Sequence, residues 1–586
     1  MKRTHYCGDL RRQQIGEDVQ IVGWVSRRRD HGGVIFVDLR DRTGIVQVVF
    51  DPIIDKAAHQ SADRLRNEFV IGVTGKIRER GEGAQNPNLD TGEVELATEE
   101  LEILNVAETP VFPIEDEVDV AEDVRLKHRY LDLRRPKMQK IIQLRHKSML
   151  ACRNYMDEQG FLEVETPILM NSTPEGARDV LVPSRLNAGN FYAMPQSPQQ
   201  FKQILMMSGV DRYFQIARCF RDEDTRADRQ LEFTQIDFEM SFATADDVMT
   251  TAEGLIKRIF EEAGGIPVET PFKRMTYDEA MERYGNDKPD TRFGMELADI
   301  SDLVADCDFK VFSSVLKNDG QVKGLAAPGG SNFTRREIDS LTDFVATYKA
   351  KGLAWIKVTQ DGFDSSIVKF FTTEQLKAIS ERMGAQAGDL MLFVADQPKV
   401  VADALANLRL HLGKKLDLID ESRFDMLWMI DFPLFEWDED DKRYQPAHHL
   451  FTSPTADTID LISENPGQVK AQHYDMVING NEVASGSVRI HQWAVQQQIL
   501  EVLNLAPEDI KTRFGYFIEA LQYGTPPHAG IAPGLDRLVM LMLGEDNIRE
   551  VIAFPKTQRG ACLMTGAPSV VSKAQLEELS IRIDDV

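Results

Sequence analysis

Residues 220–239 read FRDEDTRADRQLEFTQIDFE, and this stretch decides the fold. Apolar and polar residues alternate on both sides of a charged loop, which predicts an antiparallel hairpin. Gln235, Asp237 and Glu239 share one face of the second strand. A sheet normally buries one face, so a polar face indicates a ligand site. Arg221 stands at a strand end, where its guanidinium can bind a phosphate or carboxylate, although a solvated hairpin loop would also carry such charges.

Two further stretches flank the hairpin in the sequence. Residues 160–169, GFLEVETPIL, follow a predicted helix at 137–159 with a glycine stop and a strand that ends at proline. Alone, this is an ordinary helix-to-strand connection. Residues 530–541, GIAPGLDRLVML, place a glycine-rich strand end before a helix whose first turn contains Arg537. Backbone N–H groups at such a helix start favour phosphate, and Arg537 could bind a γ-phosphate.

Length, charge and cysteine usage limit the class of protein. A chain of 586 residues is too long for one hydrophobic core and predicts three or four domains. Its net charge of -26 repels phosphates overall, so a nucleic-acid site would need a local arginine patch. No long apolar run or secretory signal is evident, so we expect no membrane association. The five cysteines are scattered and form no CxxC pair, which argues against disulfides or zinc and favours the cytoplasm.

The chain divides into segments of different character. Five candidate strands with a helix after the third have the order of an OB-fold, although another small β-barrel would fit as well. These strands are predicted at 18–25, 34–38, 44–50, 69–78 and 93–104, and the helix at 53–66. An acidic run then indicates a hinge, and a break at residues 286–290 opens an α/β insertion with its own strands and helices. The predicted segments are an OB-fold at 1–105, a hinge at 106–136, an α+β domain at 137–286 and 421–556, the insertion at 287–420, and a C-terminal extension at 557–586.

The three stretches, in this order, resemble the three signature motifs of class II aminoacyl-tRNA synthetases. The barrel, the hinge, residues 173–179, residues 196–202, the insertion and His448-His449 extend the resemblance to bacterial aspartyl-tRNA synthetases over nearly the whole chain. This resemblance implies an antiparallel sheet of six or seven strands flanked by helices, and a homodimer that uses the first motif. It also implies that L-aspartate and ATP form aspartyl-adenylate, which is then transferred to the 3′ end of tRNA.

The resemblance assigns roles to residues that match the family pattern. Arg221 and Arg537 are the expected catalytic residues. The expected aspartate site comprises Glu175, Ser197, Gln199, Lys202, Arg221, Asp237, His448 and Arg489. The expected ATP site comprises Arg221, Asp222, Glu223, Gln230, Glu482, Gly534, Leu535, Asp536 and Arg537. Asp475 and Glu482 are the expected Mg²⁺ ligands, since Mg²⁺ prefers oxygen donors and ATP phosphates. Leu231, Leu450, Ser485 and Pro533 depart from the family pattern, but none of them replaces a charged ligand.

The barrel is expected to bind the tRNA anticodon. Arg27, Arg28, Arg29, Arg40 and Arg42 are predicted to gather at one barrel edge, with Phe36 and Phe50 as stacking platforms for unpaired bases. Gln47 is expected to read the central anticodon uridine. His31 and Gly83 resemble the non-discriminating subgroup, which aspartylates both tRNA-Asp and tRNA-Asn, and whose product on tRNA-Asn needs a tRNA-dependent amidotransferase.

Other interpretations of the sequence remain possible. A strictly tRNA-Asp-specific enzyme would share all but the His31 and Gly83 features. Asparaginyl and lysyl synthetases share the fold, but the large insertion and the pair Lys202 and Arg489 disfavour them. An aspartate–ammonia ligase would lack the barrel at residues 1–105. A non-catalytic RNA-binding module would not need Arg221 and Arg537.

Overall fold

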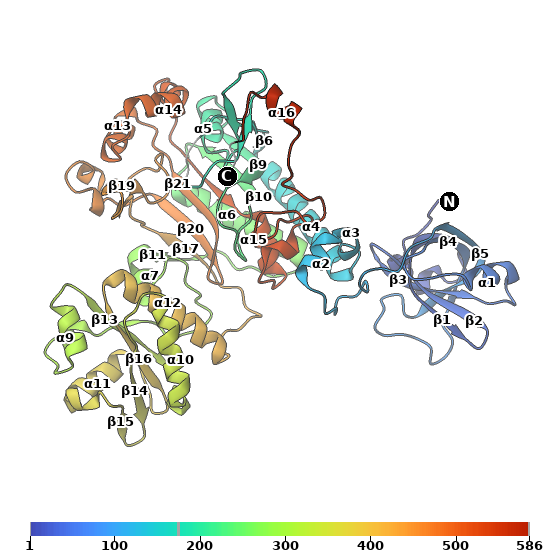
Figure 1. Ribbon diagram of the computed structural model, residues 1–586, viewed down its shortest axis with the longest axis horizontal. Coiled ribbons are helices and arrows are strands. Elements are labelled where there is room, and N and C mark those ends of the chain that lie inside the picture. The colour runs from blue at the N-terminus through green and yellow to red at the C-terminus, as the bar shows by residue number, and fades with distance from the viewer. Residues whose placement is uncertain (1, 173–175, 584–586) are drawn as a thin grey trace.

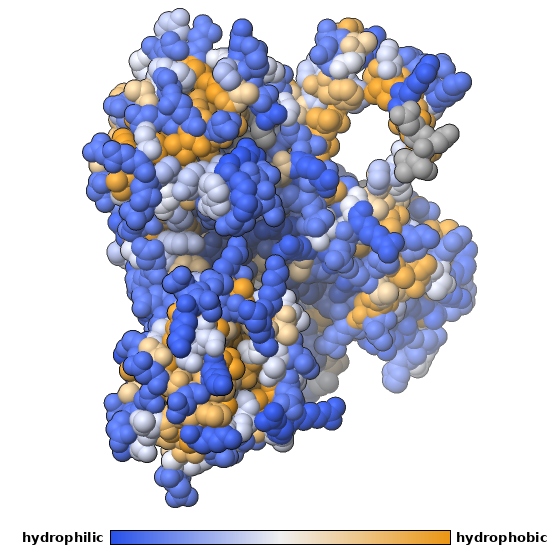
Figure 2. All heavy atoms as spheres, turned by 60° about the vertical axis from the view of Figure 1, so that its left-hand side comes forward, coloured by the Kyte–Doolittle hydropathy of each residue, from blue (hydrophilic) through white to orange (hydrophobic). Residues whose placement is uncertain are grey.

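The computed structural model describes residues 2–172 and 176–583. Figure 1 shows three bodies: an N-terminal barrel, a central domain built on a large sheet, and an inserted domain on the opposite side of that sheet from the barrel. None of the described helices combines the length and apolar character that a membrane span requires. The face drawn in Figure 2 is mostly hydrophilic, with apolar side chains in small groups.

The N-terminal domain is a closed five-stranded barrel in the order β1-β2-β3-β5-β4. Its elements are β1 (Asp18–His31), β2 (Val34–Asp41), β3 (Gly44–Phe50), α1 (Lys56–Ala62), β4 (Val70–Glu79) and β5 (Val94–Asn105). Every second residue of β2 points inward, so Ile35, Val37 and Leu39 are at most 1% exposed. The helix between the third and fourth strands and the parallel pairing of β3 with β5 confirm the predicted OB-fold.

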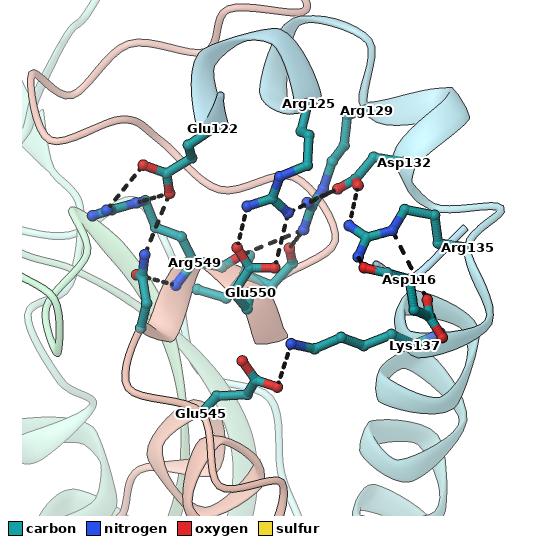
Figure 3. Close-up of polar contacts among 12 residues, drawn as sticks. Asp116, Glu122, Arg125, Arg129, Asp132, Arg135, Lys137, Glu545, Arg549 and Glu550 are labelled. Atoms are coloured by element: carbon teal, nitrogen blue, oxygen red, sulfur yellow. Dashed lines mark hydrogen bonds and ion pairs between the residues drawn. The ribbon is translucent and has the colours of Figure 1, made fainter. Parts of the chain in front are cut away.

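The segment after the barrel is fixed to the central domain by ion pairs (Figure 3). It contains α2 (Glu122–Lys127) and α3 (Arg129–Asp132). Asp132 is fully buried and accepts hydrogen bonds from Arg129 at 2.5 Å and from Arg135 at 2.8 Å. Arg125 pairs with Glu550 at 2.8 Å, far along the chain. The second half of the predicted hinge therefore packs against the central domain. Arg134 also connects this segment to the barrel, through an ion pair with Glu68 at 2.8 Å.

The central sheet has eight strands in the order β11-β17-β20-β21-β22-β10-β9-β6. They are β6 (Leu162–Glu163), β9 (Arg212–Phe220), β10 (Glu232–Ser241), β11 (Lys273–Thr276), β17 (Met426–Ile430), β20 (His473–Ile478), β21 (Asn481–Val488) and β22 (His528–Pro533). The prediction of six or seven antiparallel strands is wrong at the two edges, where the short strands β6 and β11 pair in parallel. The six strands between them are antiparallel as expected.

The two faces of this sheet differ in character. Three helices, α4 (Pro136–Glu158), α6 (Ala245–Ile259) and α15 (Leu535–Met542), cover one face and share its core. Ile236 and Phe238 point into that core and are fully buried. Gln235, Asp237 and Glu239, which alternate with them along β10, point to the opposite face, beside α5 (Gln199–Met207). Alternation along β10 thus places an apolar layer on one face and the charged groups of the site on the other.

The inserted domain has a five-stranded sheet in the order β12-β13-β16-β14-β15. The strands are β12 (Ala298–Asp299), β13 (Gln321–Ala327), β14 (Ala354–Thr359), β15 (Gly362–Asp364) and β16 (Leu390–Asp396), and all their pairings are antiparallel. Helices α10 (Arg335–Ala346) and α12 (Pro398–Lys415) share one core, whereas α8 (Ser301–Val304), α9 (Lys310–Leu316) and α11 (Thr373–Arg382) share another. Helices on both faces give the domain its own interior.

Smaller elements complete the central domain. They are β7 (Leu181–Pro183), β8 (Phe191–Ala193), α7 (Tyr277–Arg283), β18 (Phe435–Asp438), β19 (Arg443–Pro446), α13 (Trp493–Val502), α14 (Pro507–Leu521) and α16 (Lys573–Glu578). The short 3-10 turn η8 (Ile548–Val551) follows α15 and carries the residues that bind the docked segment. Of these elements, η8 alone contributes a lining residue, Ile548, to the cavity described below.

Candidate active site

A cavity of about 370 Å³ opens on the polar face of the central sheet. The β9–β10 hairpin, α5, the β20–β21 hairpin and the start of α15 surround it. Thirteen of the predicted site residues line this one cavity, although they come from distant parts of the chain: Ser197, Gln199, Lys202, Arg221, Glu223, Gln230, Asp237, His448, Glu482, Arg489, Gly534, Asp536 and Arg537. The second and third predicted motifs therefore converge on one place, whereas residues 160–169 contribute no residue to the lining.

Four buried charges form one end of the cavity. Lys202 Nζ lies 2.7 Å from Asp237 Oδ1 and 3.5 Å from Glu239 Oε2. Arg489 binds Glu239 through two hydrogen bonds of 2.8 and 3.1 Å. All four side chains are at most 2% exposed. Two cations and two anions balance each other here, and each would be costly to bury alone.

The local environment shifts the pKa values of these acids in opposite directions. Burial raises the pKa of Asp237, even though the Lys202 ammonium beside it acts in the other direction. Burial also acts to raise the pKa of Glu239, but Arg489 and Lys202 outweigh it and the pKa lies below its usual range. Asp237 is therefore the acid of this pair that is more readily protonated.

Two histidines beside the charged group are held neutral. Burial, together with neighbouring imidazoles and Arg489, holds the pKa of His448 well below its usual range. Burial, then Arg489 and Lys202, do the same to the pKa of His449. His449 Nε2 lies 2.8 Å from Arg489 Nη1, and neutral His449 can accept that hydrogen bond. Positive charge at this end of the cavity therefore comes from Lys202 and Arg489 alone.

The other end of the cavity carries two half-buried arginines. Arg221 follows β9, and its guanidinium lies 5.0 Å from the centre of the Phe233 ring. Arg537, in the first turn of α15, donates to the Glu482 carbonyl and lies 3.4 Å from the Asp228 carboxylate. These contacts are partly open to solvent, so an incoming phosphate can replace them at modest cost.

Two carboxylates on the β20–β21 hairpin fit a Mg²⁺ ion. Burial raises the pKa of Glu482, and the negative charge of Asp475 raises it further. His473 Nε2 lies 2.8 Å from Asp475 Oδ1 and orients that carboxylate. Neighbouring buried acids of this kind are stabilised by a cation with oxygen preference. No group of three or more His, Cys, Asp or Glu side chains suited to a metal occurs in the described part of the chain, so substrate oxygens would have to complete the shell.

The remaining predicted site residues do not line the cavity. Leu535 is fully buried in the apolar core, because its side chain points to the opposite face of the sheet. Asp222 is outside and pairs with Arg178 at 3.6 Å. Asp475 is set back behind the lining, and Glu175 lies outside the described residues. Asp536 reaches the cavity wall, but its carboxylate accepts from Thr234 N at 2.7 Å and ties α15 to the hairpin.

Several lining residues were not predicted. They are Asp228, Arg229, Phe233, Thr234, Lys288, His449, Val483, Ala484, Ser485, Ala532 and Ile548, whereas Gln235 was expected on the polar face of its strand. Phe233 lies on the same face of β10 as Gln235 and Asp237 and could have been found from the hairpin pattern, whereas no local pattern indicates Lys288. Ser485 and Pro533 depart from the family pattern, yet the β21–β22 register is intact, with Ala484 opposite Pro533. The Ser485 hydroxyl lies 3.1 Å from His473 Nε2 and thus belongs to the site.

The barrel surface agrees with the sequence prediction only in part. Arg27 and His31 are exposed, and Gln47 is held by Glu95 at 2.8 Å on the outer face. The prediction that Phe50 offers a stacking platform is wrong, because its ring is 1% exposed and lies in the barrel core. Arg40 is also unavailable, because it is 4% exposed and forms a buried pair with Glu68.

The other predicted barrel residues lie on the outside. Phe36 is half-buried on β2, opposite Arg29 on β1. Arg29 is paired with Asp38 at 2.6 Å, and Arg28 with Asp63 at 2.7 Å. Gly83 has a φ of +77°, so a side chain at this turn would be strained.

Comparisons with known proteins agree with this geometry. A model of the tRNA synthetases class II (D, K and N) matches residues 121–558, and a model of the OB-fold nucleic acid binding domain matches residues 19–104. The chain is 55% identical to the aspartate–tRNA(Asp/Asn) ligase of Geotalea uraniireducens over 581 residues, which is 99% of this chain and 98% of that protein. It is 55% identical to the protein of the same name from Desulfosudis oleivorans over 583 residues, which is 100% of this chain and 98% of that one.

Solved structures support the fold. The asparaginyl-tRNA synthetase of Pyrococcus horikoshii complexed with asparaginyl-adenylate has a TM-score of 0.59 at 18% identity, covering 95% of this chain and 98% of that one. An aspartyl-tRNA synthetase from Entamoeba histolytica has a TM-score of 0.57 at 20% identity, covering 94% and 91%. Family model, full-length relatives and architecture together show that the chain belongs to the class II aminoacyl-tRNA synthetases of the D, K and N group.

Proposed function

We propose that the protein activates L-aspartate with ATP and transfers the aspartyl group to tRNA-Asp and tRNA-Asn. The observation that carries this proposal is the buried cation pair of Lys202 and Arg489, at 2% and 1% exposure, at one end of the cavity. A pocket with two buried cations suits a substrate side chain that is a carboxylate. The relatives at 55% identity over the full length, named as ligases of aspartate with tRNA(Asp/Asn), support the same substrate.

Selection of aspartate follows from these charges. Lys202 and Arg489 would bind the side-chain carboxylate of the substrate, while Asp237, Ser197 and Gln199 would bind its ammonium group. Asparagine has the same shape but no charge on its side chain, so it could not form the ion pairs with Lys202 and Arg489, which would keep only Asp237 and Glu239 as charged partners in the buried site. Such a loss discriminates far more strongly than a difference in size.

Arginines at the opposite end would position the nucleotide. Arg221 would bridge the α-phosphate and the substrate α-carboxylate, and Arg537 would bind the terminal phosphates, with Glu223 facing the adenine amino group. The α-carboxylate oxygen attacks the α-phosphorus in line, the bond to the bridging oxygen breaks, and its electron pair leaves with pyrophosphate. No protein nucleophile is needed, because positioning and charge neutralisation lower the barrier. Asp475 and Glu482 would hold Mg²⁺, which neutralises phosphate charge when bound.

Transfer to tRNA uses the barrel and the same cavity. Arg27, Arg29, Phe36 and Gln47 on the outer barrel surface would bind the anticodon, and the 3′-hydroxyl of the tRNA would take the aspartyl group from the adenylate. We assign residues 1–105 to anticodon binding, the two parts of the central domain to catalysis, and residues 287–420 to an insertion. The five cysteines are all free and buried, which suits the reducing cytoplasm.

A homodimer is supported by exposed apolar side chains around the first motif. Leu150 is 50% exposed although other residues of α4 are buried in the core, and Leu162 on β6 is 57% exposed. Ile168, Leu169, Leu181 and Phe191 are each between 47% and 56% exposed in the same part of the chain. A cluster of this kind marks a protein interface.

Aspartylation of purified tRNA-Asp and tRNA-Asn, measured in parallel, tests the tRNA specificity. We expect both tRNAs to accept aspartate at comparable efficiency, and His31→Leu to reduce charging of tRNA-Asn selectively. Aspartyl-tRNA-Asn would then require an amidotransferase. Charging of tRNA-Asp alone would leave a strictly specific enzyme and make His31 and Gly83 neutral variation.

A further inference from the structure

The connection between α7 and the inserted domain reaches the cavity. Lys288, in the segment 286–290, lines the same space as Arg537, Glu482 and Asp228. In the sequence, residues 286–290 stood out only as the break that opens the insertion, and no site residue was predicted among them. A lysine from this segment therefore joins the second and third motifs at the end of the cavity where the terminal phosphates would lie.

Lys288 is held there by a firmly anchored backbone. Its N–H donates to Asn286 Oδ1 at 3.0 Å, which closes a tight turn. Two residues further on, Asp290 is 4% exposed and binds Arg292 at 2.8 Å. Asp290 also packs on Gly480, where an added Cβ would meet its Cβ at 3.0 Å. Gly480 forms the turn between β20 and β21, so the segment is fixed to the hairpin that carries Asp475 and Glu482.

The electrostatic environment places the ammonium beside the carboxylates of this hairpin. The charge of Lys288 acts to lower the pKa of Glu482 and of Asp287, although burial and Asp475 outweigh it in both cases. No carboxylate within the described ranges approaches Lys288 Nζ closely enough to form an ion pair, whereas Lys202, Arg489 and Arg537 are each paired. Lys288 is exposed and lines the cavity, so its ammonium is available to a substrate bound there.

We propose that Lys288 binds the β- and γ-phosphates of ATP and stabilises the departing pyrophosphate. Lysine is a compact cation that binds phosphate as a point charge. When the α-carboxylate attacks, the bond between the α-phosphorus and its bridging oxygen breaks and negative charge grows on the pyrophosphate. A cation fixed beside that group stabilises the transition state more than the ground state. The inserted domain is thereby connected to the reaction through its first residues.

The role of Lys288 in the reaction rests on the proposed function, but its role in binding ATP does not. A direct measurement of nucleotide binding therefore distinguishes failure of this inference from failure of the proposed function. Binding of ATP and of AMP, each with Mg²⁺, is measured by calorimetry on the full chain for the wild type, Lys288→Gln and Lys288→Arg. We expect Lys288→Gln to weaken ATP binding roughly 10- to 100-fold, as for one lost charged hydrogen bond, while AMP binding stays within twofold. Lys288→Arg should restore most of the ATP affinity. Lys377→Gln, an exposed lysine on α11, serves as the control and should match the wild type.

Aspartate-dependent ATP–pyrophosphate exchange provides the kinetic readout. Lys288→Gln should raise KM for ATP and for pyrophosphate together and should also lower kcat, because the transition state loses more stabilisation than bound ATP does, while KM for aspartate is unchanged. Unchanged ATP binding in Lys288→Gln, or an equal loss of AMP binding, would overturn the inference. Absence of exchange in the wild type would instead refute the proposed function. The calorimetric comparison of ATP and AMP binding would then still decide whether Lys288 binds the terminal phosphates.

Discussion

Replacing Lys202 by methionine tests whether the charge of this lysine selects the side-chain carboxylate of aspartate. The ammonium is 2% exposed and lies 2.7 Å from Asp237 and 3.5 Å from Glu239, so its loss leaves two buried acids with Arg489 alone. Truncating one partner of a buried, hydrogen-bonded charge pair costs about 2–5 kcal/mol. At about 1.4 kcal/mol for each factor of ten, kcat/KM for aspartate should fall roughly 30-fold to several thousand-fold.

The loss should be specific to the charged substrate. The asparagine side chain has no carboxylate for Lys202 to bind, so its residual activation should fall much less, and the preference for aspartate should shrink at least about tenfold. Affinity for ATP should stay within twofold, because Lys202 lies at the other end of the cavity. Aspartate- and asparagine-dependent ATP–pyrophosphate exchange at saturating ATP measures both effects, with calorimetric ATP binding alongside.

The control must separate binding from folding. Lys257→Met replaces a half-exposed lysine that forms only a helical surface pair with Glu261 at 3.8 Å, and it should behave as the wild type. Circular dichroism checks that Lys202→Met is folded at the assay temperature. If folded Lys202→Met loses less than about tenfold in kcat/KM for aspartate, or loses activity toward asparagine equally, then Lys202 does not select the carboxylate.

Three further predictions concern stability, pH and tRNA. Asp132→Asn leaves buried arginines without their shared carboxylate and should lower the free energy of unfolding by about 3–5 kcal/mol, so an unchanged calorimetric midpoint would contradict the role given to this residue. His448 and His449 have depressed pKa values in the folded state, so stability should be lost as pH falls below 6.5, the usual histidine value, by about 1.4 kcal/mol per pH unit for each. Chemical denaturation between pH 7.5 and 5.5 measures this, and replacing both by glutamine should flatten the dependence. Arg27→Ala should weaken tRNA binding and lower the slope of affinity against salt by about one, with pyrophosphate exchange unaffected.

Alternation along strands made much of the site predictable. The hairpin at residues 220–239 puts Ile236 and Phe238 in the core and Asp237 on the polar face, and a period of two requires this once one face is buried. The same rule would have corrected the prediction for Phe50. Phe50 lies an even number of residues from Val46 and Val48 along β3, so it points into the core as they do. Phe36 lies between two buried residues of β2 and therefore points outward.

Contacts between distant segments could not be predicted in this way. Lys288 reaches the cavity only because Asp290 packs on the turn at Gly480, a contact that joins residues far apart in the sequence. Leu535 follows the glycine-rich strand as the motif requires, but the rotation of α15 turns its side chain toward the core. Edge strands of two and four residues, β6 and β11, are also too short for a recognisable period.

The parallel pairing of β11 with β17 explains how such a large insertion is tolerated. Two parallel neighbours cannot be joined by a tight turn, so the chain between Thr276 and Met426 must cross over the sheet in any case. Thr291 and Asp425, near the two ends of the insertion, are joined by a hydrogen bond of 2.8 Å. The chain therefore enters and leaves the inserted domain at adjacent points. The domain beyond Thr291 can accordingly be enlarged, exchanged or removed, in evolution or by engineering, without moving any strand of the central sheet. Within the insertion, only the entry segment that contains Lys288 contributes to the active site.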